Sequence, residues 1–151
     1  MRISREKMFI EIAEVVAKRG TCDRAYVGAV LTLNNRIVSI GYNGAPSGKP
    51  HCDEVGHKLQ ANHCTNAVHA EINCIGFFKE NSLSLDKDSE LVLYVTHEPC
   101  WNCLSYITQT AIRVHKIPLS KIIYKTEYGK DVMKIDFCRE WGVELVRFNE
   151  N

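Results

Sequence analysis

The sequence predicts an α/β protein with three layers, in which a central mixed sheet of five strands lies between helices. Two observations lead to this class. Two β-rich segments near the N-terminus are separated by a short Asn-Asn turn, which is typical of an antiparallel hairpin. After the hairpin, strand-like and helix-like segments alternate, and such alternation indicates a sheet that is covered on both faces.

Local signals place the first elements. Ser4 has the character of an N-cap, apolar residues then recur at helical spacing, and Gly20 ends the pattern. The hairpin strands are VGAVLTL and RIVSIGY, joined by Asn34 and Asn35. The stretch 43–66 is rich in Gly, Pro, His, Cys and Asp, and a long irregular loop of this kind is usually functional or held by a ligand.

The second half of the chain supplies the remaining elements. A helix is expected over 66–79, and another begins at Pro99, a residue type that suits the first turn of a helix. A third helix ends at Gly142. The expected strands here are LVLYVT, KIIYKT and VELVRF.

Composition limits the function classes. A chain of 151 residues fits one domain, so 1–151 is expected to form a single unit. A net charge of +1 gives no electrostatic support for a nucleic-acid partner. No apolar run approaches the roughly 18 residues that a membrane helix needs, and no leader is recognisable. We therefore expect a cytoplasmic protein with no membrane partner.

Seven cysteines in such a chain favour metal binding over a disulfide frame. His69 stands at the start of one expected helix, and Cys100 and Cys103 stand at the start of the next. Residues three apart share a helix face, so both sulfurs can reach one ion. Three ligands leave a fourth tetrahedral position for water, which is the pattern of a catalytic zinc.

Glu71 follows the expected histidine ligand by two residues and need not bind the metal. A carboxylate beside zinc-activated water can take up its proton and pass it to a substrate nitrogen. H-x-E or C-x-x-C alone is weak evidence, because most such motifs are solvated helix starts or redox pairs. Their combination, with Pro99 directly before Cys100, is specific.

HAE followed by PCWNC matches the H-x-E…P-C-x-x-C signature of zinc-dependent nucleoside and nucleotide deaminases. From about residue 10 to residue 148, including VGAVLTLNNRIVSIGYNGAPSG and HCDEVGHKLQANHCTNAVHAEINCI, the chain resembles deoxycytidylate (dCMP) deaminases. The resemblance implies the cytidine-deaminase-like fold and hydrolysis of dCMP to dUMP and ammonia, which supplies dUMP for dTMP synthesis. Zinc-activated water would attack C4 of cytosine, and Glu71 would protonate N3.

Further site residues follow from the resemblance alone. Asn43 in GYNG resembles a residue that binds the sugar hydroxyl, although an Asn before Gly is also common in plain turns. Arg24 and Tyr128 resemble residues on the phosphate side of the pocket, and each could equally be a surface side chain. The backbone at Ala70 and Cys100 resembles the part that contacts the base.

The resemblance also implies regulation. Family enzymes are often homohexamers that dCTP activates and dTTP inhibits, with Mg²⁺ accompanying the triphosphate. The allosteric site is expected at Gly41, Asn43 and Gly44, where glycines let backbone N–H groups approach a phosphate. One departure is Glu80, which stands where a regulated relative has Arg.

A second zinc is expected in the 43–66 loop. From the residues alone, buried free cysteines and surface histidines are the favoured interpretation; the resemblance reverses it, because relatives often carry such a site. The expected ligands are Cys22, Cys52, His57 and Cys64, with His63 in reserve. The remaining residues of these types, expected to be non-ligands or core residues, are His51, His97, His115, Cys74 and Cys138.

Two other functions remain open. The first is deamination of nucleic acid, either adenosine in tRNA or cytidine in a polynucleotide, with the same zinc and glutamate. The near-neutral charge counts against it. The second is a binding module without activity that uses two zinc ions only to fold. Glu71 separates this alternative from an enzyme, because a structural site needs no proton carrier.

Overall fold

The computed structural model describes residues 1–22, 25–45, 48–57, 59–60, 63–64, 67–78, 85–129 and 131–150. Its elements, in chain order, are α1 (Arg5–Ala17), β1 (Gly28–Leu33), β2 (Arg36–Tyr42), α2 (Cys52–Val55), β3 (Leu59–Gln60), β4 (His63–Cys64), α3 (Ala70–Gly76), β5 (Leu91–His97), α4 (Trp101–Ser105), the π-helix η2 (Tyr106–Val114), β6 (Leu119–Thr126), α5 (Val132–Glu140) and β7 (Glu144–Arg147). None of the described helices is long and apolar enough to cross a membrane.

The central sheet has five strands in the order β2-β1-β5-β6-β7, which confirms the predicted mixed sheet. β1 pairs antiparallel with both β2 and β5, whereas β5, β6 and β7 run parallel. The carboxyl ends of β5 and β6 therefore meet at one edge of the sheet, and the segments that follow them, from Glu98 and from Glu127, start side by side. Ligand sites of open α/β sheets form at such edges.

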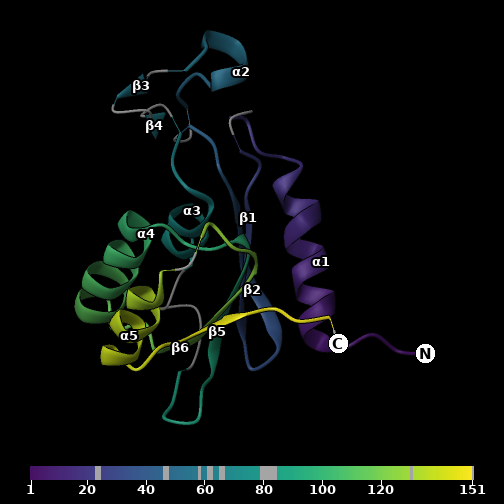
Figure 1. The fold of residues 1–151 in the computed structure, drawn as a ribbon, viewed down its shortest axis with the longest axis vertical. Coiled ribbons are helices and arrows are strands. Elements are labelled where there is room, and N and C mark those ends of the chain that lie inside the picture. Colours follow the sequence, from purple (N-terminus) through teal and green to yellow (C-terminus); the bar gives the residue numbers. More distant parts are fainter. Residues whose placement is uncertain are drawn as a thin grey trace.

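Helices cover both faces of the sheet, as the sequence predicts (Figure 1). α1 packs on one face, where Phe9 and Ile10 belong to a buried cluster that includes Val30 and Tyr94 of the sheet. α3, α4 and α5 cover the opposite face over a larger cluster that includes Leu31. The three layers are thus held by two separate apolar cores, one on each side of the sheet.

Two glycines let helices approach the hairpin closely. A Cβ at Gly28 would lie 2.0 Å from the carbonyl oxygen of Ala13 in α1. A Cβ at Gly41 would lie 2.5 Å from the amide nitrogen of Cys74 and 2.6 Å from the carbonyl oxygen of Ala70, both in α3. Because these are main-chain atoms, only glycine allows α1 and α3 to reach this distance.

The predicted Asn-Asn turn is present. Asn34 and Asn35 have φ angles of 49° and 66°, the left-handed values that a two-residue type I′ hairpin turn requires. Asn34 also donates its N–H to the carbonyl of Glu90 and accepts the N–H of Glu90 at Oδ1, at 2.9 and 2.8 Å. These bonds fasten the hairpin turn to the start of β5.

Three expectations on element boundaries need correction. The helix expected to begin at Pro99 starts at Trp101, with Cys100 as its N-cap, and continues from Tyr106 as the π-helix η2. The helix expected over 66–79 is α3, which begins only at Ala70 because His69 has extended backbone angles (φ −68°, ψ 152°) and serves as its N-cap. The stretch 43–66 is not wholly irregular, since it contains α2 and the antiparallel pair β3–β4. These elements have two to four residues each, too few for a hydrophobic period to reveal them.

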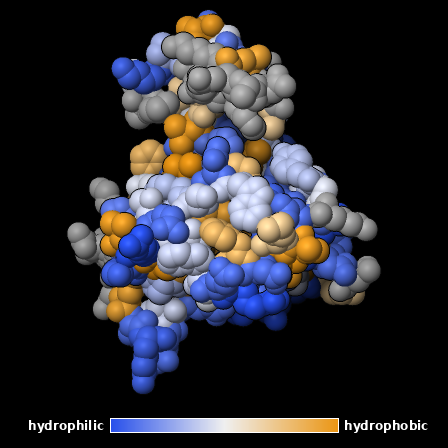
Figure 2. Space-filling view, turned by 60° about the vertical axis from the view of Figure 1, so that its left-hand side comes forward, coloured by the Kyte–Doolittle hydropathy of each residue, from blue (hydrophilic) through white to orange (hydrophobic). Residues whose placement is uncertain are grey.

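The small elements α2, β3 and β4 project from the body as an insertion (Figures 1 and 2). Among the described side chains between residues 48 and 67, only Cys52 is buried, whereas Val55 and Leu59 are more than half exposed. In the described part, the insertion therefore has almost no apolar core of its own. A segment of this kind needs another source of order.

Candidate metal centre and active site

Two helix starts bring three potential zinc ligands together. His69 is the N-cap of α3 and Cys100 is the N-cap of α4, and neither side chain makes a capping hydrogen bond. Cys103 lies one turn into α4 and is fully buried. The predicted grouping of these three residues is present, because their ligand atoms all lie within 4.8 Å of one another.

The distances between these atoms fit zinc. His69 Nδ1 lies 3.5 Å from Cys100 Sγ and 3.2 Å from Cys103 Sγ. A tetrahedral zinc with its ordinary bond lengths to nitrogen and sulfur separates such a donor pair by about 3.5 Å. Imidazole nitrogen and thiolate sulfur are also the donor types that zinc prefers. His69, Cys100 and Cys103 are therefore suited to hold one zinc ion and to leave its fourth position open.

Crowding of the donors shifts their pKa values. Hydrogen bonds from Cys103 and from His69 place the pKa of Cys100 well below its ordinary value, although burial opposes this change. A hydrogen bond between His69 and Cys100 raises the pKa of His69. A separate hydrogen bond between Cys103 and Cys100, together with burial, raises the pKa of Cys103. The three side chains thus favour one thiolate and share the remaining protons among them. A divalent cation can take the place of these protons.

Glu71 lies in the first turn of α3, and only 4% of its surface is exposed. Burial raises the pKa of this carboxyl, whereas hydrogen bonds from its own backbone N–H and from Cys103 partly offset the shift. Glu71 is therefore a buried carboxyl in contact with one of the three donors. A carboxyl in this position can accept and return a proton beside the open metal position.

The backbone at Ala70 and Cys100 occupies the start of a helix in each case. Ala70 is the first residue of α3, and Cys100 caps α4. N–H groups at a helix start have no partner within the helix, so they are available to a ligand. The structure thus places both residues where the expected backbone contacts with a base are chemically reasonable.

Tyr128, which follows β6, also lies at this end of the sheet. Burial, and to a smaller extent the negative charges of Glu71 and Cys100, raise the pKa of its hydroxyl. Its ring stacks on His97 with centroids 5.4 Å apart and an interplanar angle of 16°. Because the side chain is 59% exposed, it remains accessible to a ligand.

His97 has a role in packing that the sequence did not indicate. Its Nδ1 lies 2.8 Å from Thr96 Oγ1, and that oxygen already accepts the N–H of Gly28 at 3.2 Å. The hydroxyl of Thr96 thus joins the start of β1 to the ring of His97. Burial lowers the pKa of His97, in agreement with a neutral ring.

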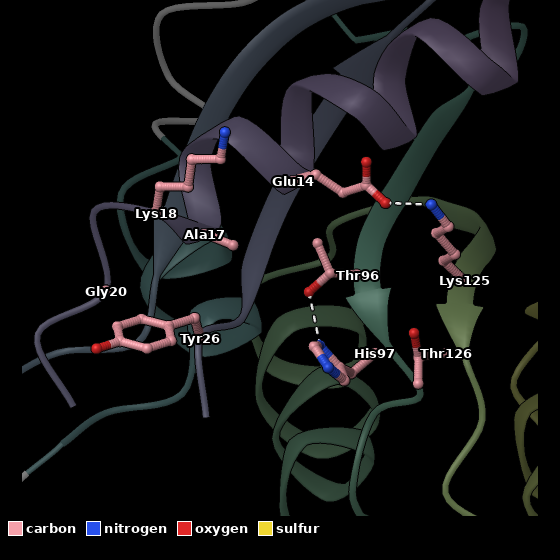
Figure 3. Close-up of a pocket in the computed structure, with 9 residues that line it drawn as sticks. All are labelled: Glu14, Ala17, Lys18, Gly20, Tyr26, Thr96, His97, Lys125 and Thr126. Carbon is pink, nitrogen blue, oxygen red and sulfur yellow. Dashed lines mark hydrogen bonds and ion pairs between the residues drawn. The ribbon is translucent and has the colours of Figure 1, made fainter. Parts of the chain in front are cut away.

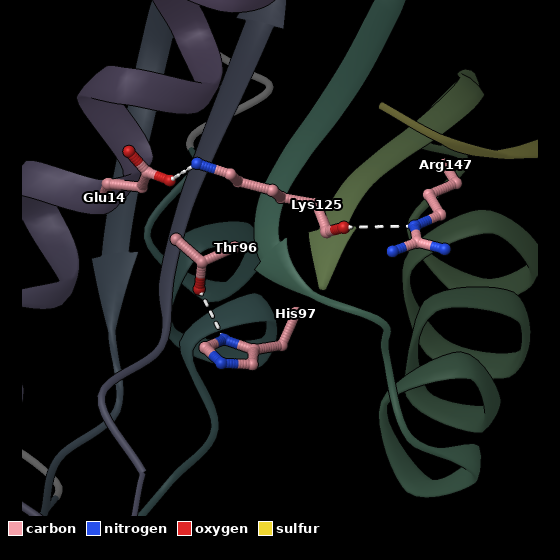
Figure 4. Close-up of polar contacts among 5 residues, drawn as sticks. All are labelled: Glu14, Thr96, His97, Lys125 and Arg147. Atoms are coloured by element: carbon pink, nitrogen blue, oxygen red, sulfur yellow. Dashed lines mark hydrogen bonds and ion pairs between the residues drawn. The ribbon is translucent and has the colours of Figure 1, made fainter. Parts of the chain in front are cut away.

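A groove of about 650 Å³ lies on the α1 side of the same sheet edge. Figure 3 shows the side chains that line it, among them His97, Lys18 and Tyr26. Figure 4 shows that Lys125 is engaged twice: its ammonium pairs with Glu14, and its carbonyl accepts Arg147 Nε–H at 3.4 Å. None of the metal donors lines the groove, and its contacts are those of the α1 side of the sheet.

Sequence reasoning missed a buried ion pair beside the metal centre. Glu98 and Lys134 have side-chain exposures of 4% and 9%, and Oε1 lies 3.8 Å from Nζ. The other carboxylate oxygen of Glu98 accepts the backbone N–H of Tyr128 at 3.2 Å. A glutamate directly before the Pro-Cys pair was the available signal, but nothing in the sequence identifies Lys134 as its partner.

The side chain of Asn43 is engaged with backbone. Its Oδ1 accepts the N–H of Val27 at 2.8 Å, and its Nδ2 donates to the carbonyls of Cys22 and Ala25. Asn43 thus fastens the segment between α1 and β1 to the end of β2. The sugar contact of Asn43 stays a prediction.

The two glycines of the expected allosteric site have structural roles. Gly41 lies within β2 and packs against α3, as described above. Gly44 exchanges both of its main-chain hydrogen bonds with Val68, at 3.1 and 2.7 Å. Val68 directly precedes His69, so the GYNG segment is joined to the first donor of the metal centre.

A second group of potential metal ligands joins the insertion to the segment after α1. Cys22, Cys52 and His57 have ligand atoms within 4.8 Å of one another, and His57 Nδ1 lies 3.5 Å from Cys22 Sγ. Three of the four expected ligands are therefore together. The backbone of Cys64 lies in β4, but the side chains of Cys64 and the reserve ligand His63 lie outside the described residues, as do Arg24 and Glu80 entirely.

Comparisons with known proteins agree with this geometry. A model of the cytidine and deoxycytidylate deaminase zinc-binding region matches residues 3–119. ComE operon protein 2 of Bacillus subtilis is 35% identical over 112 residues, which are 74% of this chain and 58% of that protein. Deoxycytidylate deaminase of Schizosaccharomyces pombe is 30% identical over 152 residues, or 97% of this chain and 45% of that protein.

Among solved structures, a dCMP deaminase from the cyanophage S-TIM5 in complex with dCMP and dUMP is similar, with a TM-score of 0.71 and 28% identity. The match covers 98% of this chain and 99% of the phage chain. The fold and the metal centre thus define a zinc-binding α/β protein of the deaminase type. The chain belongs to the cytidine and deoxycytidylate deaminase family. The match covers 58% of the Bacillus subtilis protein and 45% of the Schizosaccharomyces pombe protein, so this chain spans about half the length of these relatives.

Proposed function

We propose that the protein is a zinc-dependent deaminase that hydrolyses dCMP to dUMP and ammonia and so supplies dUMP for dTMP synthesis. One observation carries this proposal: His69, Cys100 and Cys103 converge at zinc-binding distances, with the buried carboxyl of Glu71 beside them. The dCMP deaminase names of relatives that match nearly the whole of this chain support the choice of substrate.

Zinc held by these three residues would supply an activated water at neutral pH. The chain's own groups move the protons. The Glu71 carboxylate takes a proton from the water that attacks C4 and gives it to N3 of the ring. Glu71 then takes the remaining proton from the new hydroxyl on C4 and gives it to the amino group. The C4–N bond breaks as the C4 carbonyl forms, so dCMP and water yield dUMP and ammonia. Backbone N–H groups at the helix starts orient the base.

The direct test is ammonia release from the purified protein with dCMP, CMP, dCTP, cytidine, adenosine and a single-stranded oligonucleotide that contains deoxycytidine. We expect turnover of dCMP and little turnover of the unphosphorylated nucleosides. Preference for the oligonucleotide, with binding that weakens as salt rises, would favour the nucleic-acid deaminase instead. Zinc content without turnover of any substrate would favour the binding module.

We also propose a second, structural zinc held by Cys22, Cys52, His57 and Cys64, with His63 as the alternative fourth ligand. The distance between Cys22 and His57 and the near absence of buried side chains in the described insertion support it. On this basis the chain 1–151 acts as one domain in which a metal fixes the insertion to the body. We propose a cytoplasmic location, where thiolate ligands stay reduced.

Regulation is proposed on the GYNG segment. We infer that dCTP activates and dTTP inhibits, that Mg²⁺ accompanies the triphosphate, and that the enzyme is a homohexamer. The hydrogen bonds between Gly44 and Val68 support coupling, because a ligand that moves Gly44 also moves the residue before His69. dCMP saturation curves with and without each triphosphate in Mg²⁺, combined with light scattering, test this. Identical curves and a monomer mass would contradict it.

A further inference from the structure

The loop after β6 places Tyr128 at the end of the sheet where the segment that carries Cys100 begins, and two residues at the end of β5 hold it there. The backbone N–H of Tyr128 donates to Glu98 Oε2 at 3.2 Å, and its ring stacks on His97. The N–H of Glu98 in turn donates to the carbonyl of Thr126 at 2.8 Å. The segments that follow β5 and β6 are therefore tied together at the point where the metal donors begin.

A glutamate at position 98 is energetically unfavourable unless its carboxylate has partners. Its side chain is 4% exposed, and a buried carboxylate costs several kcal/mol unless a partner compensates. Lys134 from the first turn of α5 provides that partner, with Nζ 3.8 Å from Oε1. An apolar pair of the same size would hold α5 to the sheet at least as well. Stability alone therefore gives no reason for charges here.

The geometry of the carboxylate gives another reason. One oxygen faces Lys134, and the other accepts the N–H of Tyr128, so the ion pair fixes where the acceptor for the loop lies. We propose that Glu98 is a positioning residue for substrate binding, which holds Tyr128 against the metal centre through its backbone N–H. This inference rests on the proposed function, since the substrate it positions is dCMP.

The test distinguishes loss of the hydrogen-bond acceptor on residue 98 from loss of the charges of Glu98 and Lys134. Glu98→Gln/Lys134→Met removes both charges but keeps an oxygen that can accept the Tyr128 N–H. Glu98→Met/Lys134→Met removes both charges and the acceptor at similar volume. Neither double variant leaves an unpaired charge in the core, so the two proteins differ chiefly in one hydrogen bond. Zinc content and thermal unfolding are measured for both.

Steady-state kinetics with dCMP give the first readout. We expect KM of Glu98→Met/Lys134→Met to rise about tenfold with kcat within about threefold of wild type. Glu98→Gln/Lys134→Met is expected to keep KM within about threefold. In a Tyr128→Ala background the two double variants should have the same KM, because the residue they position is gone. The proposal would be overturned if the two double variants had equal KM values in the protein that retains Tyr128.

Amide hydrogen exchange gives a readout that does not depend on dCMP turnover. The Tyr128 amide should exchange at least about tenfold faster in Glu98→Met/Lys134→Met than in Glu98→Gln/Lys134→Met. If the wild type did not deaminate dCMP, this comparison would still test the contact, and equal exchange rates would refute it. If the methionine variant does not fold, Glu98→Asp replaces it, because aspartate keeps the charge but is one methylene shorter and moves the acceptor oxygen away. KM for dCMP and exchange of the Tyr128 amide are then measured in the same way.

Discussion

Cys103 Sγ lies 3.2 Å from His69 Nδ1, although 34 residues separate the two in the chain. The contact exists because α3 and α4 both begin at the same edge of the sheet, one before β5 and the other after it. The metal centre is therefore a product of the fold rather than of a local loop. A substitution of one donor should remove the metal and leave the sheet intact.

The proton carrier is tested by Glu71→Gln. The amide preserves the shape of the side chain but cannot accept and return a proton, so kcat should fall by at least about 100-fold. Zinc content should stay at the wild-type value, because Glu71 is not a ligand in this scheme. Glu140→Gln, on the exposed end of α5, is the matched control and should be fully active. If Glu71→Gln kept more than about a tenth of the wild-type kcat, Glu71 would not be the proton carrier.

The catalytic zinc is tested by Cys100→Ser. Loss of one thiolate from a three-ligand site should remove the metal and turnover together. Cys138→Ala is the control, since Cys138 is buried in α5 away from the donors. That variant should lose some stability but keep zinc and kcat. Metal retention in Cys100→Ser, measured by mass spectrometry of the native protein, would show that Cys100 is not a required ligand.

Sequence patterns could predict most of this fold, because its core elements are long and regular. Alternating apolar segments, Asn34-Asn35 and the two helix starts at His69 and Cys100 carry strong local signals. The Glu98–Lys134 pair could not be predicted in this way, since a contact between a loop and a later helix has no sequence spacing rule. The elements of the insertion were missed because they are too short to have a period.

The second zinc is tested by Cys52→Ser with metal analysis and thermal unfolding. Wild type should contain two zinc ions per chain, and the variant should keep one. Since Cys52 is the buried residue of an insertion with little core in its described part, loss of this metal should lower Tm by several degrees. Cys74→Ala, in the core of α3, should keep both ions. One zinc per chain in wild type purified without chelators would reject the site.

The packing of α3 against β2 is tested by Gly41→Ala. The added Cβ would lie 2.5 Å from the amide nitrogen of Cys74, so either the strand or α3 must shift. We expect a loss of roughly 1–3 kcal/mol in the free energy of unfolding, as for other overpacked positions. Because α3 also carries Glu71, kcat should fall in the same variant.

The control is Gly76→Ala in the same helix, where the nearest atom to an added Cβ is the Tyr106 hydroxyl at 3.9 Å. Alanine favours a helix over glycine by up to about 1 kcal/mol, so this variant should be neutral or more stable. Urea unfolding of the two variants measures the contrast. If Gly41→Ala were as stable and active as Gly76→Ala, close contact between β2 and α3 would not be what positions Glu71 beside the metal donors.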